Sequence, residues 1–192
     1  MADPALVRAR HMKSRLEEIR KLPPLDAERV LARVPAESQQ RIADAASIEW
    51  LDMRIDLEVT NAIRAGLGEA AFHRFFREAQ AEAFSGPLLR VMVDAALRVF
   101  RMDAAAFTGW LGRGWSLVFR NCGSWRTERV GADEARVRIL GLPPECASDE
   151  VWLASVADSI AAFFLVARTP GECLLAASDP AQGTASYHLS WR

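Results

Sequence analysis

Histidine and cysteine are among the residue types of this chain that could ligate a metal, and the sequence holds three of each. His73 lies in the stretch AAFHRFFRE, where only Glu69 stands at helical spacing from it with a metal-binding side chain. Two ligands are fewer than the three or four protein ligands of a zinc site. Cys122, Cys146 and Cys173 are far apart and form no CxxC pair. We therefore expect neither a metal site nor a bound cofactor, and we expect His73 at a helix edge or on the surface.

An enzyme would have to use His188, in the alternating stretch TASYHLSW. A general base needs a nucleophile or an orienting carboxylate within hydrogen-bond reach, and the chain has neither a GxSxG nor an HExxH pattern. Cys122 is the candidate nucleophile, because the nearby guanidinium groups of Arg120 and Arg126 would lower its pKa. An enzyme that uses His188 with Cys122 or an arginine is therefore one hypothesis. The sequence favours a protein that is not an enzyme, and we assign no catalytic residue.

Aromatic and arginine side chains gather in the second half of the chain and point to a ligand. Arginines on one face of a sheet can bind a carboxylate or phosphate, or can form an ordinary solvated face. Large aromatic side chains can line a pocket for a flat ligand, although they also fill cores. We predict that a small hydrophobic or anionic ligand is bound by Trp110, Trp115, Phe119, Arg120, Tyr187, His188 and Trp191. The arginines considered with this group are Arg113, Arg120, Arg126, Arg129, Arg136 and Arg138.

The elements that must position these side chains change in character near Gly114. Before it, apolar residues such as Phe72, Phe75 and Phe76 recur at helical spacing. After it, alternation predicts strands at 115–121, EARVRIL, ECLLAAS and TASYHLSW, interrupted by a helix capped by Ser148. The pattern predicts an α+β fold in which an N-terminal helical bundle packs on a C-terminal, mostly antiparallel sheet of about five strands with one inserted helix. We expect a helical N-terminal segment at 1–50 and an α+β domain at 51–192.

The N-terminal stretch carries a short apolar stripe. A helix over residues 4–21 would place Met12, Leu16 and Ile19 on one face, with charges elsewhere. The stripe is too short for a stable free coiled coil, so it must dock on its own domain, on a sister subunit or on a partner. We retain Met12, Leu16 and Ile19 as candidate partner-binding residues, which makes a protein partner or a homodimer the second hypothesis.

The charge balance excludes some partners. The chain has 24 Lys plus Arg against 25 Asp plus Glu, a net charge of −1, which argues against nucleic-acid or anionic-membrane binding. No apolar run approaches the roughly 20 residues of a membrane span, and no secretory signal is recognised near residue 1. The odd number of cysteines indicates a reducing compartment. We expect a cytoplasmic protein without a membrane span.

The second half also resembles a known family. The stretches GLGEAAFHRFFREAQAEAFSGPLLRVM, WSLVFRNCGSW, GLPPE, RTPGEC and GTASYHLSW resemble a paralogous bacterial family of unknown function known mainly from myxobacteria, over residues 50–192. The layout of that family resembles the haem-nitric-oxide-binding and vinyl-reductase-like sensor domains. The chain lacks the proximal histidine in the middle of the sequence and the Tyr-x-Ser-x-Arg signature of the haem sensors, so no haem ligand is carried over. The resemblance implies a regulatory or ligand-sensing module, and a non-enzymatic module of this kind is our leading hypothesis.

Overall fold

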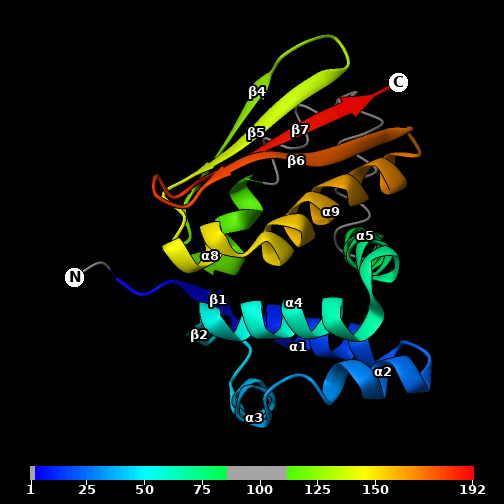
Figure 1. Cartoon of the computed structure of the whole chain (residues 1–192), viewed down its shortest axis with the longest axis vertical. Helices are drawn as coiled ribbons and strands as arrows, with labels where there is room; N and C mark the ends of the chain where they lie inside the picture. Colours follow the sequence, from blue (N-terminus) through cyan, green and yellow to red (C-terminus); the bar gives the residue numbers. More distant parts are fainter. Residues whose placement is uncertain (1–2, 86–111) are drawn as a thin grey trace.

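The computed structural model describes residues 3–85 and 112–192. Trp110, and the helices predicted between residues 86 and 111, lie outside the described residues. Figure 1 shows the described elements in layers. A four-stranded sheet lies at one end, α8 (Pro144–Ser148) and α9 (Glu150–Ala167) lie beneath it, and the N-terminal helices follow.

The first described element is a strand, not a helix. β1 (Leu6–Arg8) precedes α1 (Ala9–Arg20) and pairs in antiparallel fashion with both β2 (Trp50–Asp52) and β3 (Phe119–Arg120). The prediction of a helix from residue 4 is therefore wrong for its first turn. The first turn of a helix leaves backbone N–H groups without partners, whereas β1 pairs on both sides.

Four further helices lie beside β2 along the chain, two before it and two after it. α2 (Pro24–Leu31) and α3 (Ala36–Asp44) lead into β2, which is followed by α4 (Met53–Leu67) and α5 (Glu69–Ser85). The Asp52 carboxylate caps α4 by accepting a hydrogen bond from the Arg54 N–H at 2.8 Å. Gly68, with φ of 76°, ends α4 and allows the sharp turn into α5.

The larger sheet has the order β4-β5-β7-β6, with every neighbouring pair antiparallel. Its strands are β4 (Ser124–Arg129), β5 (Glu134–Leu140), β6 (Gly171–Asp179) and β7 (Thr184–Trp191). The predicted alternation in β5 and β7 is confirmed, because every second side chain is buried against the helices: Ala135, Val137, Ile139, Ala185, Tyr187 and Leu189.

The outer face of this sheet carries the other half of the alternation and concentrates positive charge. Arg126 of β4 lies directly opposite Arg138 of β5, and Arg136 of β5 lies between Glu128 and His188. Like charges directly opposite each other weaken a strand pair. The strand alternation places these arginines on the solvent side of the sheet, away from the core.

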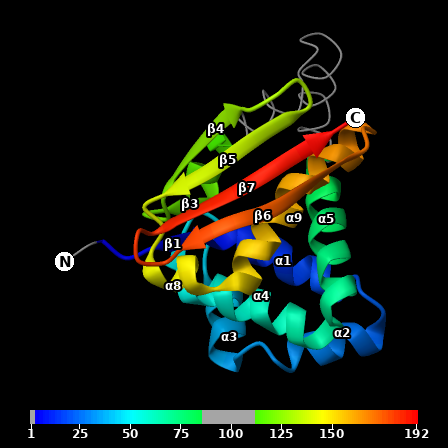
Figure 2. The same ribbon diagram turned by 45° about the horizontal axis from the view of Figure 1, so that its top comes forward.

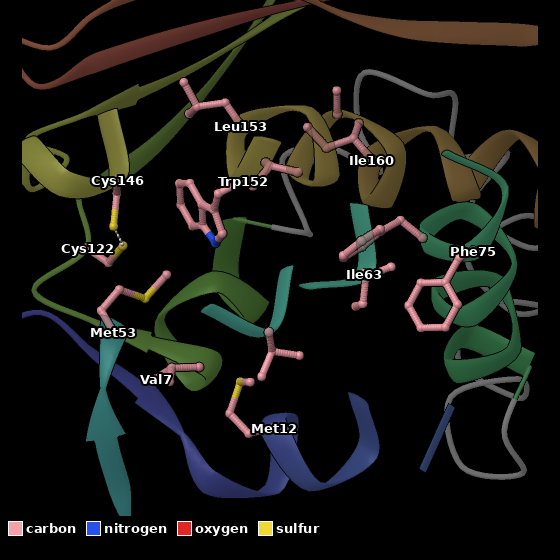
Figure 3. Packing of buried hydrophobic residues seen from close by; sticks show 14 of the residues in the cluster. Val7, Met12, Met53, Ile63, Phe75, Cys122, Cys146, Trp152, Leu153 and Ile160 are labelled. Carbon is pink, nitrogen blue, oxygen red and sulfur yellow. Dashed lines mark hydrogen bonds between the residues drawn. The ribbon is translucent and has the colours of Figure 1, made fainter. Parts of the chain in front are cut away.

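α9 is the central helix of the core. It is long and apolar enough to cross a membrane by length and composition, yet 61% of its most apolar window is buried inside this fold. Its N-cap is Asp149, whose carboxylate accepts a hydrogen bond from the Trp152 N–H at 2.8 Å. The predicted cap, Ser148, is instead the last residue of α8. Figure 3 shows Trp152 and Ile160 projecting from α9 into the core above Met12.

The stretch that contains Trp115 is a correction to the predicted sheet. Residues 112–118 are helical, and only Phe119 and Arg120 form a strand. Trp115, Val118 and Phe119 are half-buried at spacings of three and four, while Leu117 is 70% exposed. These residues satisfy helical spacing as well as alternation, and so short a stretch does not separate the two periods.

The predicted α+β class with helices packed on an antiparallel sheet is confirmed. The single sheet of about five strands is instead a four-stranded sheet and a separate three-stranded sheet, because β3 pairs with β1 rather than with β4. One cluster of buried side chains runs from Ala5 to Leu189. The described residues on the two sides of residue 50 thus share one core.

Candidate functional site

A small cavity of about 70 Å³ lies between α1, α5 and α9. Figure 2 shows these three helices together at the side of the molecule beneath the sheet. Its lining mixes polar and apolar side chains: His11, Ser14, Arg15, Glu18, Phe76, Ala79, Gln80, Ala83 and Ser159. We call this cavity the α1–α5–α9 pocket.

Arg15 is the half-buried cation of this pocket. Its guanidinium carbon lies 4.3 Å from the centroid of the Phe76 ring, and its Nη2 lies 3.1 Å from His11 Nε2. Its Nη1 is buried and has no hydrogen-bond partner in the described structure. Burial lowers the pKa of Arg15, and the charges of Asp56 and Glu18 raise it again. The guanidinium stays positively charged, so one of its donor groups is desolvated without an acceptor.

His11 is held as a neutral imidazole. Burial, followed by the adjacent charge of Arg15, lowers its pKa to about 4. With Nε2 accepting a hydrogen bond from Arg15 Nη2, the proton lies on Nδ1. The His11 ring also packs edge-on against Phe119, with ring centroids 5.8 Å apart. His11 therefore joins the pocket to β3.

A buried carboxylate lies deeper in the core, on α4. Asp56 is 2% exposed, and its Oδ2 accepts a hydrogen bond from Trp152 Nε1 at 2.9 Å. Its Oδ1 has no partner, and neither has the hydroxyl of Thr60 one turn later. Neither residue lines the pocket, but the charge of Asp56 acts on both His11 and Arg15. The charged group of α4 thus interacts electrostatically with His11 and Arg15 of α1.

One lysine pairs with Glu18, which lines the pocket. Lys21 Nζ lies 2.8 Å from Glu18 Oε1 and 2.7 Å from Glu82 Oε1, and these hydrogen bonds raise the pKa of Lys21. The ammonium therefore links the end of α1 to α5. The three groups are more than one-fifth exposed, so the pair energies are small.

An aromatic cluster adjoins the pocket on the side of β3. The Trp115 ring centroid is 4.4 Å from that of Phe119, 5.5 Å from that of Trp125 and 6.1 Å from that of Trp152. The indole N–H of Trp115 donates to the Cys122 carbonyl at 3.1 Å. Trp115 and Phe119 are thus brought together, as the sequence predicts, but they pack on other aromatic side chains.

The other predicted ligand residues that the structure describes are not brought to this place. Arg120 stacks on Trp50 in the three-stranded sheet, with its guanidinium carbon 4.5 Å from the ring centroid. Tyr187 is fully buried under the larger sheet, while His188 is on the opposite, outer face of the same strand. Trp191, at the end of that strand, packs partly buried against the core. One ligand could not contact both Tyr187 and His188.

Met12, Leu16 and Ile19 are core residues in this structure. Each is at most 3% exposed and belongs to the main buried cluster. The stripe therefore docks on its own domain, the first of the three alternatives, and these side chains are not accessible to a partner.

The other histidine and the cysteines have structural partners. His73 Nδ1 lies 2.6 Å from Asp158 Oδ2, and Arg77 Nε donates to Asp158 Oδ1 at 2.8 Å. This pairing fastens α5 to α9. The sulfurs of Cys122 and Cys146 are 3.9 Å apart inside the core (Figure 3), and the hydrogen bond to Cys122, followed by burial, raises the pKa of Cys146.

Sequence reasoning missed His11 and Arg15. The available signal was their spacing of four, which places both at the edge of the Met12 and Leu16 stripe. Their partners, Phe76 and Asp56, are far away in the sequence and follow from the packing of α1 against α4 and α5.

Comparison with known proteins shows similarity of fold. No family model matches the chain, and no curated protein matches it. Among solved structures, one described as probing haem distortion in the H-NOX family has a TM-score of 0.62 at 10% identity, covering 96% of this chain and 95% of that one. The unliganded Fe(II) H-NOX protein from K. algicida has a TM-score of 0.60 at 10% identity, covering 96% of both chains.

A third similar structure is an oxygen-binding H-NOX domain related to soluble guanylate cyclases. Its TM-score is 0.58 at 11% identity, and the match covers 96% of this chain and 95% of that one. At such low identity these matches establish the fold alone. The resemblance to haem-nitric-oxide-binding sensor domains is thereby confirmed, at the level of the fold and over nearly the whole chain.

Proposed function

We propose that this protein is a non-enzymatic sensor module that binds a small ligand in the α1–α5–α9 pocket. The observation that carries the proposal is Arg15, whose buried Nη1 lacks a partner in a cavity of about 70 Å³. A desolvated donor without an acceptor is costly and is retained where it has a role. The H-NOX-like fold supports the same conclusion by analogy.

The described residues do not fit a haem. Haem iron takes an axial His, Cys, Tyr or Met ligand. His11 is bonded to Arg15, His73 to Asp158, and His188 lies on the outer face of the sheet. The cysteines, Tyr187 and the described methionines Met12 and Met53 are enclosed in the packed core. We therefore derive no function through haem.

The hypothesis of an enzyme with His188 and Cys122 has no geometric support. His188 points to the solvent side of the larger sheet, whereas Cys122 is 1% exposed and lies in the core beside Cys146. A general base must come within hydrogen-bond reach of its nucleophile. The two side chains lie on opposite sides of the sheet layer.

Ligand binding in the pocket can change the structure of β3 through His11. Its ring contacts Phe119, and Phe119 pairs with Val7 in the three-stranded sheet. β3 has only two residues, so few hydrogen bonds hold it. A ligand that moves His11 would change the packing of β3, and a change in this short strand needs little free energy.

Ligand binding is tested by NMR. A library of small polar compounds is screened against the ¹⁵N-labelled protein, and we expect a binder to shift the amides of residues 11–18 and 76–83 together with those of Val7 and Phe119. His188→Ala is the control, and it should leave binding unchanged. If no compound binds, or if binding is lost in His188→Ala but kept in Arg15→Gln, the proposal is wrong.

A second observation favours a partner-binding role for the three-stranded sheet. Arg8 stacks on Trp50 with its guanidinium carbon 3.6 Å from the ring centroid, and donates to the carbonyls of Ile48 and Leu117. Ile48 is 81% exposed and Leu117 70%. Arg120 covers the same Trp50 ring. Cationic and apolar groups together suit an acidic, amphipathic protein segment.

This second role is tested with a fluorescent peptide of alternating Glu and Leu residues as the probe. Ile48→Ser and Arg120→Glu should each weaken binding in fluorescence polarisation. Leu25→Ser is the matched control, because Leu25 is 74% exposed on α2. An equal loss in all three variants would reject this surface.

A further inference from the structure

We propose that the α1–α5–α9 pocket recognises the carboxylate group of a short-chain carboxylic acid, with Arg15 Nη1 as its hydrogen-bond donor. This inference rests on the proposed function and names its ligand class. The pocket, Arg15 and the neighbouring acidic groups each restrict the chemistry of the ligand.

The first restriction is the need for a negatively charged acceptor. Arg15 already uses Nη2 at His11 and one face of the guanidinium at Phe76, which leaves Nη1 buried and unpaired. A guanidinium is a donor only, so the missing group must be an acceptor. A charge-assisted hydrogen bond to an anion is about twice as strong as a neutral one.

His11 does not compete for that anion as a charged group. Its pKa of about 4 keeps the ring neutral near pH 7. Its contact with Arg15 fixes the guanidinium in place, as does the stacking on Phe76. A planar, preorganised guanidinium loses little entropy when a carboxylate binds.

The second restriction is the total charge that the surroundings accept. Glu18 lines the pocket, and Asp56 is near enough for its charge to act on Arg15. Lys21 is shared between Glu18 and Glu82, so it neutralises only one of the two. A dianion such as phosphate or sulfate would be repelled by the carboxylates of Glu18 and Asp56, and Arg15 is the one cation among the pocket-lining residues. A monoanion is therefore favoured.

The third restriction is size. The cavity of about 70 Å³ has room for only a few water-sized groups. Phe76, Ala79 and Ala83 supply an apolar wall, which suits a methyl or ethyl group. Ser14 and Ala83 are exposed, so a longer chain could extend past them to solvent.

The neutral polar side chain of Gln80 completes the pocket. It is half-buried in the lining and makes no hydrogen bond to a described side chain. Its amide can donate to the second carboxylate oxygen. The pocket therefore offers one charged and one neutral donor, together with an apolar wall, which matches acetate or propionate better than a larger or more highly charged ion.

The test compares acids with their isosteric amides. Isothermal titration with acetate, propionate, acetamide and propionamide is run on the full chain, with phosphate and sulfate as further probes. We expect the carboxylates to bind at least about tenfold more tightly than the amides, because a hydrogen bond to a charged group contributes about 1.5–3 kcal/mol. Arg15→Gln should lose a similar factor, and Arg10→Gln, on the exposed side of the same helix, should lose none.

Arg15→Lys is a second variant that keeps the test informative if Arg15→Gln does not fold. It retains the charge but not the planar fork, and it should bind acetate with intermediate affinity. The acid and amide pairs on the unaltered protein need no variant at all. The amides of residues 11–18 and 76–83 must shift in NMR spectra when acetate binds.

Each outcome decides the inference. Equal binding of acetate and acetamide, tighter binding of phosphate or sulfate, or unchanged acetate affinity in both Arg15 variants would overturn it. If another class of compound binds this pocket while the carboxylates do not, the ligand class is wrong and the proposed sensor function stands. If no compound of any class shifts the pocket amides, the proposed function fails as well.

Discussion

The indole N–H of Trp152 on α9 donates to the buried carboxylate of Asp56 on α4 at 2.9 Å. This hydrogen bond joins the helix under the larger sheet to the N-terminal helices, and Figure 3 shows the indole nitrogen directed toward them. The bond reaches Asp56 Oδ2, whereas Oδ1 has no hydrogen-bond partner in the described structure, so the indole is the one donor to this carboxylate there.

Trp152→Phe should therefore destabilise the protein strongly. It removes the only hydrogen bond that the structure describes for the Asp56 side chain, and we expect the free energy of unfolding to fall by about 2–4 kcal/mol. Urea denaturation measures the change. In an Asp56→Ala background the same substitution should cost less, because no buried carboxylate is left unpaired; strictly additive losses would contradict the coupling.

Tyr187→Phe should leave the protein as stable as before or stabilise it by about 1 kcal/mol. The Tyr187 hydroxyl is fully buried, has no hydrogen-bond partner, and burial raises its pKa. Thermal unfolding followed by circular dichroism measures the effect. Tyr187→Leu, which removes ring contacts as well, is the comparison and should destabilise. A clear loss of stability in Tyr187→Phe would show that the hydroxyl has an acceptor.

His11→Gln should reduce the sensitivity of the protein to mild acid. The pKa of His11 is about 4 in the folded chain and about 6.5 in the unfolded chain. The unfolded chain therefore takes up a proton between these values and the folded chain does not. The stabilisation by neutral His11 is present above pH 6.5 and is lost as the pH falls toward 4, by up to about 3 kcal/mol.

The measurement is the free energy of unfolding in urea at several pH values within that window. The unaltered protein should lose more stability than His11→Gln does, and His188→Gln should behave like the unaltered protein because His188 is on the outer face of the sheet. Parallel curves for the unaltered protein and His11→Gln would refute the assignment.

The thiols should be unreactive in the folded protein. Cys122, Cys146 and Cys173 are all buried, and the pKa values of Cys146 and Cys173 are raised, the latter chiefly by burial. Because the thiolate is the reactive form, iodoacetamide should label none of the three within the time that labels all of them in urea. Mass spectrometry counts the labels. Rapid labelling of Cys122 in the folded state would restore it as a candidate nucleophile.

The strands and helices that the sequence predicted well have local signals. β7 matches TASYHLSW because the alternation continues over eight residues and one face is buried. α5 matches because Phe72, Phe75 and Phe76 keep one period over a long helix. Periods that extend over several turns or strand pairs are hard to mistake.

The elements that were predicted wrongly depend on partners far away in the sequence. Leu6 to Arg8 form a strand only because Trp50 and Phe119 bring backbone partners to both sides. The helix that contains Trp115 is short, and its aromatic residues fit either period. No local pattern distinguishes these cases, because the free energy that stabilises these elements comes from tertiary pairing.

The candidate site was predicted only in part. Trp115 and Phe119 do lie together, next to the pocket, but Tyr187 and His188 point to opposite faces of one strand. Residues adjacent in a strand cannot serve one pocket, and the alternation itself contained this information. The spacing of four between His11 and Arg15 was visible in the sequence, but the packing of Arg15 on Phe76 of α5 follows only from the tertiary structure.

The facing arginines Arg126 and Arg138 have a consequence for the behaviour of the protein in salt. Both are exposed on neighbouring strands, and their mutual repulsion is screened by dissolved ions. At low ionic strength the β4–β5 hairpin should therefore open more readily to hydrogen exchange than the β6–β7 hairpin. Added electrolyte should narrow that difference, so that the β4–β5 pair becomes more stable in media that weaken the ion pairs elsewhere on the surface.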